Sequence, residues 1–136
     1  MDESPDYAPD AGPNRHGGPI APPLYANHIV RRPLGTPDPI QQRATDPDFD
    51  GFVPQAGLPE IEPLKAYAIL NGGAEFEFFR YARHGERVLV TQRYVDIREM
   101  KSAKGSMIAC EIESEFRTSE GELLLRARRT QLRRPA

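Results

Sequence analysis

The chain has 136 residues, is 38% apolar and 28% charged, and carries a formal net charge of -2, values that are ordinary for one globular domain with a single core. This charge disfavours a nucleic-acid-binding protein, because affinity for phosphate backbones requires a concentrated excess of Lys and Arg. The single cysteine, Cys110, excludes an internal disulfide, and no apolar run approaches the ~20 residues that span a bilayer. We therefore expect a cytoplasmic protein without a membrane segment.

Proline divides the chain into two unlike parts. Thirteen of the fourteen prolines lie within residues 1–63, and proline interrupts regular strands. We expect an irregular N-terminal arm over residues 1–19, followed by a single domain over residues 20–136. This domain contains a Pro-rich loop at residues 33–63, which is too polar and too broken to fold alone.

One helix is predicted in the first part, over residues 20–32. Pro22 and Pro23 suit the first turn of a helix, where the missing N–H group is not needed. Apolar side chains then recur at helical spacing, at Leu24, Tyr25, Ile29 and Val30. Pro33 ends the predicted helix.

After Leu64 the apolar pattern changes to the period of two that is typical of β-strands. The clearest strand is predicted over residues 106–117, with Cys110 on its apolar face and charged side chains on the other. Cys110 is therefore expected to be a buried packing residue. Further strands are predicted over residues 74–80, 88–97 and 122–132. Hairpin turns are predicted at residues 101–105 and 119–121.

The run of residues 70–80, Leu-Asn-Gly-Gly-Ala-Glu-Phe-Glu-Phe-Phe-Arg, together with this order of elements, resembles the MaoC-like dehydratase/hydratase family. The Ile-Ala-Pro-Pro of residues 20–23 resembles the approach to the central helix in the N-terminal, non-catalytic halves of that family. The resemblance implies an α+β hotdog fold, a curved antiparallel β-sheet wrapped around one central helix. Such a fold usually begins with a further strand, which nothing before Ile20 supplies. We expect either a shortened form or a neighbouring molecule that covers the free sheet edge.

The family carries an Asp-x-Asn-Pro-x-His motif, in which Asp and His activate a water molecule for addition to an acyl thioester. The matching segment is Asp2-Glu3-Ser4-Pro5-Asp6-Tyr7, where Ser4 replaces Asn and Tyr7 replaces His. A Tyr with a pKa of about 10 is a poor base near neutral pH. We therefore expect no catalytic residue here. The resemblance implies the acyl-binding, non-catalytic half of an (R)-specific 2-enoyl-CoA hydratase or 3-hydroxyacyl-thioester dehydratase, a lyase of lipid metabolism.

The same resemblance implies a hotdog partner, either a catalytic MaoC-like subunit or a second copy of this chain. The substrate would be an acyl thioester of coenzyme A or of acyl carrier protein, and no metal or redox cofactor is implied. One alternative is a non-catalytic acyl-thioester-binding or structural dimerisation module. Another is a hotdog thioesterase, which usually needs an acidic residue on the central helix, and residues 20–32 contain none.

Six residues are predicted to bind substrate: Asn71, Gly72, Gly73, Phe79, His28 and Arg128. The two glycines would let a thioester approach backbone N–H groups, although such glycines are also common turn residues. His28 would contact substrate from the helix, or be satisfied by a neighbouring side chain. Arg128 belongs to a basic cluster that would hold coenzyme phosphates, or else pair with Glu111, Glu113 and Glu115 of the adjacent strand.

Overall fold

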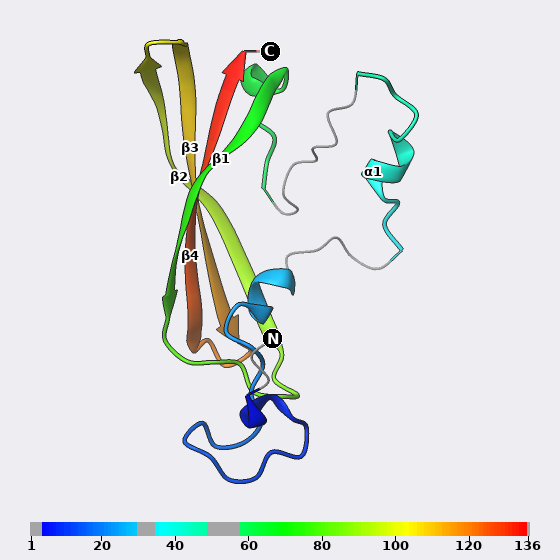
Figure 1. Ribbon diagram of the computed structural model, residues 1–136, viewed down its shortest axis with the longest axis vertical. Coiled ribbons are helices and arrows are strands. Elements are labelled where there is room, and N and C mark those ends of the chain that lie inside the picture. Colours follow the sequence, from blue (N-terminus) through cyan, green and yellow to red (C-terminus); the bar gives the residue numbers. More distant parts are fainter. Residues whose placement is uncertain (1–3, 30–34, 49–57, 136) are drawn as a thin grey trace.

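The computed structural model describes residues 4–29, 35–48 and 58–135. Its main feature is one antiparallel sheet with the strand order β1-β4-β3-β2, whose long strands twist about one another in Figure 1. The strands are β1 (Tyr67–Phe78), β2 (Val88–Ser102), β3 (Gly105–Thr118) and β4 (Leu123–Pro135). In the described part of the chain, β1 and β2 are therefore the two edges of the sheet.

All four predicted strands are present, and the two predicted turns join β2 to β3 and β3 to β4. β1 begins earlier than predicted, at Tyr67, and runs through the Asn-Gly-Gly segment. Its pairing with β4 shifts register between Asn71 and Ala74, which marks a β-bulge. Gly73 has a φ of 119°, a conformation that favours glycine. These glycines therefore form a bulge inside a strand rather than a junction before it.

The two faces of the sheet differ in chemistry. Phe116 of β3 and Ala127 of β4 lie on one face, which we call the core face, and both are fully buried. Glu113 of β3 and Arg128 of β4 lie opposite each other on the other face, which we call the charged face. Cys110 is buried on the core face, and burial raises the pKa of its thiol. Its predicted packing role is confirmed.

The predicted helix over residues 20–32 is wrong in its extent and its type. In the described part of that range only one helix forms, the five-residue 3₁₀ helix η2 (Tyr25–Ile29). Ile20 instead forms an isolated antiparallel bridge with Arg83 and is 2% exposed. Because the backbone of Ile20 is bonded to a distant segment, it cannot begin a helix. The end of the predicted helix lies outside the described residues.

Although it is short, η2 occupies the position expected of the central helix, against the core face of the sheet. Ala26 of η2 belongs to one buried cluster with Phe116, Leu125 and Ala127. The Asn27 side-chain oxygen accepts a hydrogen bond from Arg129 of β4. η2 therefore closes one part of the core, and the N-terminal segment beside it lies at one end of the sheet (Figure 1).

The remaining helical elements are single turns. They are η1 (Pro5–Tyr7), α1 (Pro39–Gln42) and η3 (Glu62–Leu64). Figure 1 shows α1 and the chain around it to the side of the sheet, within the Pro-rich loop. Across the described ranges, no helix has the length and apolar character needed to cross a membrane.

Candidate functional site

Polar side chains of the segment that resembles the catalytic motif make hydrogen bonds that fix its backbone. The Ser4 hydroxyl caps η1 and accepts from the Asp6 N–H group at 3.4 Å. The Asp6 carboxylate accepts from the Asn14 side-chain amide at 3.0 Å, and the Asp6 carbonyl accepts from the Ile20 N–H group at 2.9 Å. Asp2, the first position of the motif, lies outside the described residues. The motif positions that are described therefore hold the loop in place.

Tyr7 stands at the histidine position of the motif, and its side chain is half-buried. In the portion of the chain that the structure describes, its hydroxyl has no hydrogen-bond partner. The His16 ring packs against Tyr81, with the ring centroids 5.5 Å apart, and His16 Nε2 accepts from Arg15 Nε at 3.1 Å. Neither His16 nor His84 pairs with a carboxylate of a described residue, and within residues 4–29, 35–48 and 58–135 no three potential metal ligands come together.

A groove of about 500 Å³ opens between η2 and the turn that joins β1 to β2. Pro22, Ala26 and Val88 contribute apolar side chains to it, and Tyr25 and His84 contribute a phenol and an imidazole, respectively. The volume falls within the usual range for a small-molecule site, about 300–1,000 Å³. Because the residues after strand β1 read only as a turn in the sequence, their meeting with η2 was not predicted.

The turn that forms one wall of the groove is fixed by an ion-pair cluster. Arg80 binds Glu86 at 2.8 Å and Glu122 at 2.7 Å, and the Arg83 N–H group donates to Glu86 at 2.7 Å. The hydrogen bonds from Arg80 lower the pKa of both glutamates, so both are ionised at neutral pH. This wall is therefore preorganised before any ligand binds.

The predicted substrate-binding residues do not converge on this groove. Gly72, Gly73 and Arg128 line a separate hollow of about 410 Å³ on the charged face of the sheet. Asn71 lies at the same bulge, and its side-chain oxygen accepts from the Gly73 N–H group at 3.0 Å. The groove is bounded instead by η2, which packs on the core face. The structure thus brings three of the six residues together on the opposite face of the sheet, with Asn71 beside them in the chain at the bulge.

The other two predicted residues lie apart from that hollow. Phe79 follows the end of β1, is 48% exposed, and lies with its ring centroid 5.6 Å from the Arg126 guanidinium carbon. This distance is within the range of a cation–π contact. The backbone of His28 belongs to η2, and its side chain lies outside what the structure describes.

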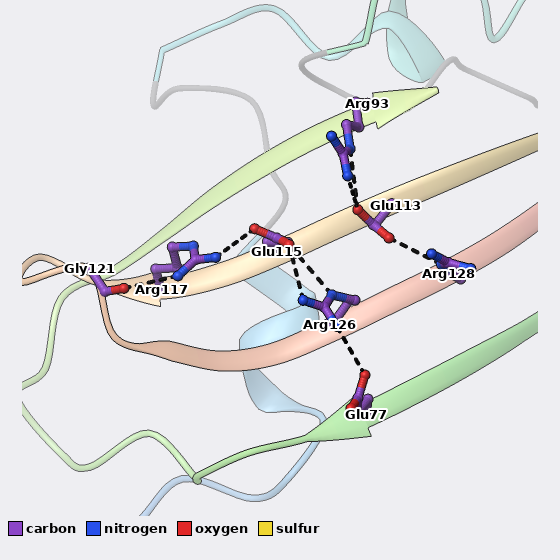
Figure 2. A network of polar contacts seen from close by, with 8 residues as sticks. All are labelled: Glu77, Arg93, Glu113, Glu115, Arg117, Gly121, Arg126 and Arg128. Carbon is purple, nitrogen blue, oxygen red and sulfur yellow. Dashed lines mark hydrogen bonds and ion pairs between the residues drawn. The ribbon is translucent and has the colours of Figure 1, made fainter. Parts of the chain in front are cut away.

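Arg128 is also part of an ion-pair network across the charged face, which Figure 2 shows. Glu113 of β3 accepts from Arg128 of β4 at 3.1 Å and from Arg93 of β2 at 2.5 Å. Glu115 likewise accepts from Arg126 at 3.4 Å. The alternative that these arginines pair with glutamates of the adjacent strand is confirmed for Glu113 and Glu115, whereas Glu111 binds Arg98 of β2 instead. The side chain of Arg128 is still 56% exposed, so it remains accessible to a ligand.

Replacing Gly72 by Ala is expected to lower the free energy of unfolding by about 1–2 kcal/mol. The new Cβ would lie 3.0 Å from the Thr130 carbonyl oxygen and 3.0 Å from Leu132 Cγ, and such overpacking strains the neighbouring strand. The matched control is Gly12→Ala, where nothing lies within 4 Å of the added atom. Urea denaturation of both variants measures the unfolding free energy. Equal decreases in Gly72→Ala and Gly12→Ala would contradict the prediction.

Comparison with protein families gives one match that covers most of the chain. The family described as FAS1-like, dehydratase domain region, matches residues 4–127. Comparison of the sequence with curated proteins gave no match.

Solved structures of similar fold cover almost the whole chain. The ChsH1-ChsH2 complex from Mycobacterium tuberculosis contains a chain that is 19% identical, with a TM-score of 0.66, and the match covers 99% of this chain and 72% of that one. The MaoC-like dehydratase from Rhodospirillum rubrum is 19% identical, with a TM-score of 0.63. The match covers 100% of this chain and 79% of that one. These similarities confirm the predicted hotdog fold. The chain belongs to the FAS1-like dehydratase region family, and its fold is similar to that of the MaoC-like dehydratase.

Proposed function

We propose that this chain is the acyl-binding, non-catalytic subunit of an (R)-specific 2-enoyl-CoA hydratase or 3-hydroxyacyl-thioester dehydratase. The observation that carries the proposal is Tyr7 at the histidine position, next to Asp6, whose carboxylate is bonded to Asn14. A phenol lacks the basic ring nitrogen with which an imidazole accepts a proton near neutral pH. The Asp and His that activate water are therefore contributed by a catalytic hotdog partner.

The groove beside η2 is where we place the acyl group. The apolar side chains of Pro22, Ala26 and Val88 suit the methylene groups of an acyl chain or of pantetheine. Tyr25 is 60% exposed at the groove, so a partner subunit that covers it would turn the groove into a tunnel. The hollow at Arg128 lies on the opposite face of the sheet, where exposed guanidinium groups suit the phosphates of the coenzyme better than its acyl chain.

The β1 edge is where we place the catalytic partner. In the described part of the chain β1 pairs only with β4, and Leu70, Phe78 and Phe79 are 41%, 42% and 48% exposed. An edge strand with exposed aromatic side chains is suited to association with another subunit. The similarity to a chain of the ChsH1-ChsH2 complex supports assembly with a second, different subunit.

Hydration of a trans-2-enoyl coenzyme A, followed by the loss of enoyl absorbance, tests the proposal. The chain alone is expected to give no rate above background. Mixed with an Asp/His-bearing MaoC-like protein encoded beside it, the chain is expected to raise the partner's kcat/KM by at least about tenfold, which is about 1.4 kcal/mol of transition-state stabilisation. Hydration by the chain alone would contradict the proposal. A mixture no faster than the partner would favour the second candidate, a non-catalytic acyl-thioester-binding module.

A groove-filling variant shows whether the groove takes part in this activity. Ala82→Leu adds an isopropyl group to a side chain that lines the groove, and we expect it to reduce the kcat/KM of the mixture by about tenfold. Ala103→Leu is the matched control, because Ala103 lies exposed in the turn between β2 and β3. If both variants retain full activity, the acyl group does not occupy this groove.

A further inference from the structure

Arg133 of β4 is a buried cation on the core face of the sheet. It pairs with Ile108 of β3 and Ile69 of β1, and alternation places it on the same face as Cys110. The residue is only 8% exposed. Its Nη2 donates to the Gln131 side-chain oxygen at 3.1 Å, whereas its buried Nε has no acceptor. Among the described residues, no carboxylate forms an ion pair or hydrogen bond with this guanidinium.

The groups around Arg133 do not balance its charge. Burial raises the pKa of Tyr94 and of Cys110, so both are protonated and uncharged at neutral pH. Glu99 is the only acidic side chain that the four strands place on the core face, and it accepts from the Ser106 hydroxyl. A guanidinium removed from water without a partner of opposite charge is costly. This end of the core face therefore favours an anion.

Gln131 marks the position in which an anion would bind. Its side-chain oxygen accepts from Nη2 of Arg133, the group next to the unpartnered Nε. A carboxylate in the same position accepts from both N–H groups of this fork, and such charge-assisted hydrogen bonds are about twice as strong as neutral ones. Gln131 is half-buried, so its side chain can turn toward solvent and open a path to the guanidinium.

The surroundings of the guanidinium select the kind of anion. Ile69 and Ile108 flank Arg133 on the neighbouring strands, and Figure 1 shows η3 at the same end of the sheet. Ile97 of β2 pairs with Cys110 and thus lies on the same face, where it is 49% exposed. A single cation among aliphatic side chains suits a singly charged group with an apolar body. A phosphate, which needs more donors, suits it less.

We propose that Arg133 binds the carboxylate of an apolar acid, which displaces the Gln131 side chain and lays its aliphatic part on Ile97. This site is separate from the groove beside η2. The groove is lined by Val88, which pairs with Thr118 at the far end of β3 from Arg133. The binding of an acid at Arg133 therefore does not depend on the proposed catalytic function.

Thermal unfolding of the whole chain, followed by circular dichroism, tests the site with octanoate as the probe. At about ten times its dissociation constant, octanoate is expected to raise Tm by about 4–6 °C. Octanamide has the same shape but no charge, and we expect it to raise Tm by less than about 1 °C. Acetate keeps the charge but lacks the apolar chain, so it should act only at a concentration higher by at least about a hundredfold.

Two replacements at the site have opposite chemistry but the same expected result. Gln131→Glu places a carboxylate of the chain itself on the Arg133 fork, and Arg133→Met removes the charge while keeping an aliphatic side chain. Neither variant is expected to melt below the wild type without ligand, and Gln131→Glu should melt above it. Both should lose the response to octanoate. The matched control is Arg134→Met, because Arg134 is exposed on the opposite face and its variant should keep the full response.

Three results would overturn the proposal. The first is a wild-type chain that octanoate stabilises no more than octanamide does, and this result decides even if a variant fails to fold. The second is a Gln131→Glu chain that melts below the wild type, which would show that the charge of Arg133 is already balanced. The third is an equal response to octanoate in Arg133→Met and Arg134→Met, which would place the bound acid elsewhere.

Discussion

Phe116→Ala is expected to lower the free energy of unfolding by about 3–5 kcal/mol, the usual cost of removing a buried aromatic side chain. Phe116 is 0% exposed and is the largest of the fully buried side chains in the described residues. It packs in one cluster with Ala26 of η2 and with Leu125 and Ala127 of β4. Its removal therefore leaves a cavity where η2 meets the sheet. Since domains are stable by only about 5–15 kcal/mol, this loss is a large share of the total.

Urea denaturation followed by circular dichroism measures this effect, with Phe79→Ala as the matched control. Phe79 loses the same atoms but is 48% exposed, so we expect its loss of unfolding free energy to stay below about 1 kcal/mol. A loss for Phe116→Ala no larger than the loss for Phe79→Ala would contradict the assignment of the core. The m value, which is the slope of the unfolding free energy against urea concentration, is expected to be similar for the two variants. Neither replacement changes by much the surface area that unfolding exposes.

The strands were predictable because one face of each strand packs in the core and the other face carries charged side chains. In β3 (Gly105–Thr118) the side chains of Ile112 and Phe116 pack in the core, while Glu113 and Glu115 bind arginines on the opposite face. Alternation in the sequence is a direct consequence of this arrangement. The strand predicted over residues 106–117 therefore matches β3 almost to its ends.

The helix and the beginning of β1 were not predictable in this way, because distant partners decide them. The Ala21 N–H group donates to the Ala82 carbonyl at 2.7 Å, across a separation that periodicity does not detect. Gly72 and Gly73 have the composition of a turn, yet pairing with β4 keeps them inside a strand. Local composition is a weak guide wherever long-range hydrogen bonds compete with it.

The candidate site was predictable in its chemistry but not in its location. The replacement of His by Tyr7 is visible in the sequence, and it carries the proposal of a non-catalytic subunit. The groove, in contrast, forms between η2 and the turn after β1, two segments that are far apart in the sequence. No pattern within either segment encodes their contact, so the groove residues Tyr25, Ala82 and His84 were not among those predicted.

Glu113 is the second residue whose replacement is expected to have a large effect, because it joins three strands. It is 3% exposed, and its two carboxylate oxygens accept from Arg93 of β2 and Arg128 of β4. In Glu113→Gln one of these oxygens becomes an NH₂ group, which cannot accept from an arginine. We expect a loss of about 1–2 kcal/mol in unfolding free energy, toward the lower end because both arginines are largely exposed to water.

Glu75→Gln is the matched control for that measurement. Glu75 lies opposite Arg128 in the β1–β4 register, on the same charged face, but is exposed and makes no ion pair with the described residues. We expect its replacement to change the unfolding free energy by less than about 0.5 kcal/mol. If both replacements lowered the unfolding free energy equally, the loss at Glu113 would come from the change in net charge and not from its contacts with Arg93 and Arg128.

The contribution of Glu113 is also expected to depend on pH. The hydrogen bond from Arg93 lowers the pKa of Glu113 in the folded protein, below the unfolded value of about 4.3. A group whose pKa is lowered by folding stabilises the protein fully above its unfolded pKa and loses this effect as the pH falls through the folded pKa. The difference in unfolding free energy between the wild type and Glu113→Gln should therefore be constant near pH 7 and should shrink below about pH 4. Urea denaturation at several pH values measures it, and a difference that grows on acidification would show that Glu113 is not held as a carboxylate by these arginines.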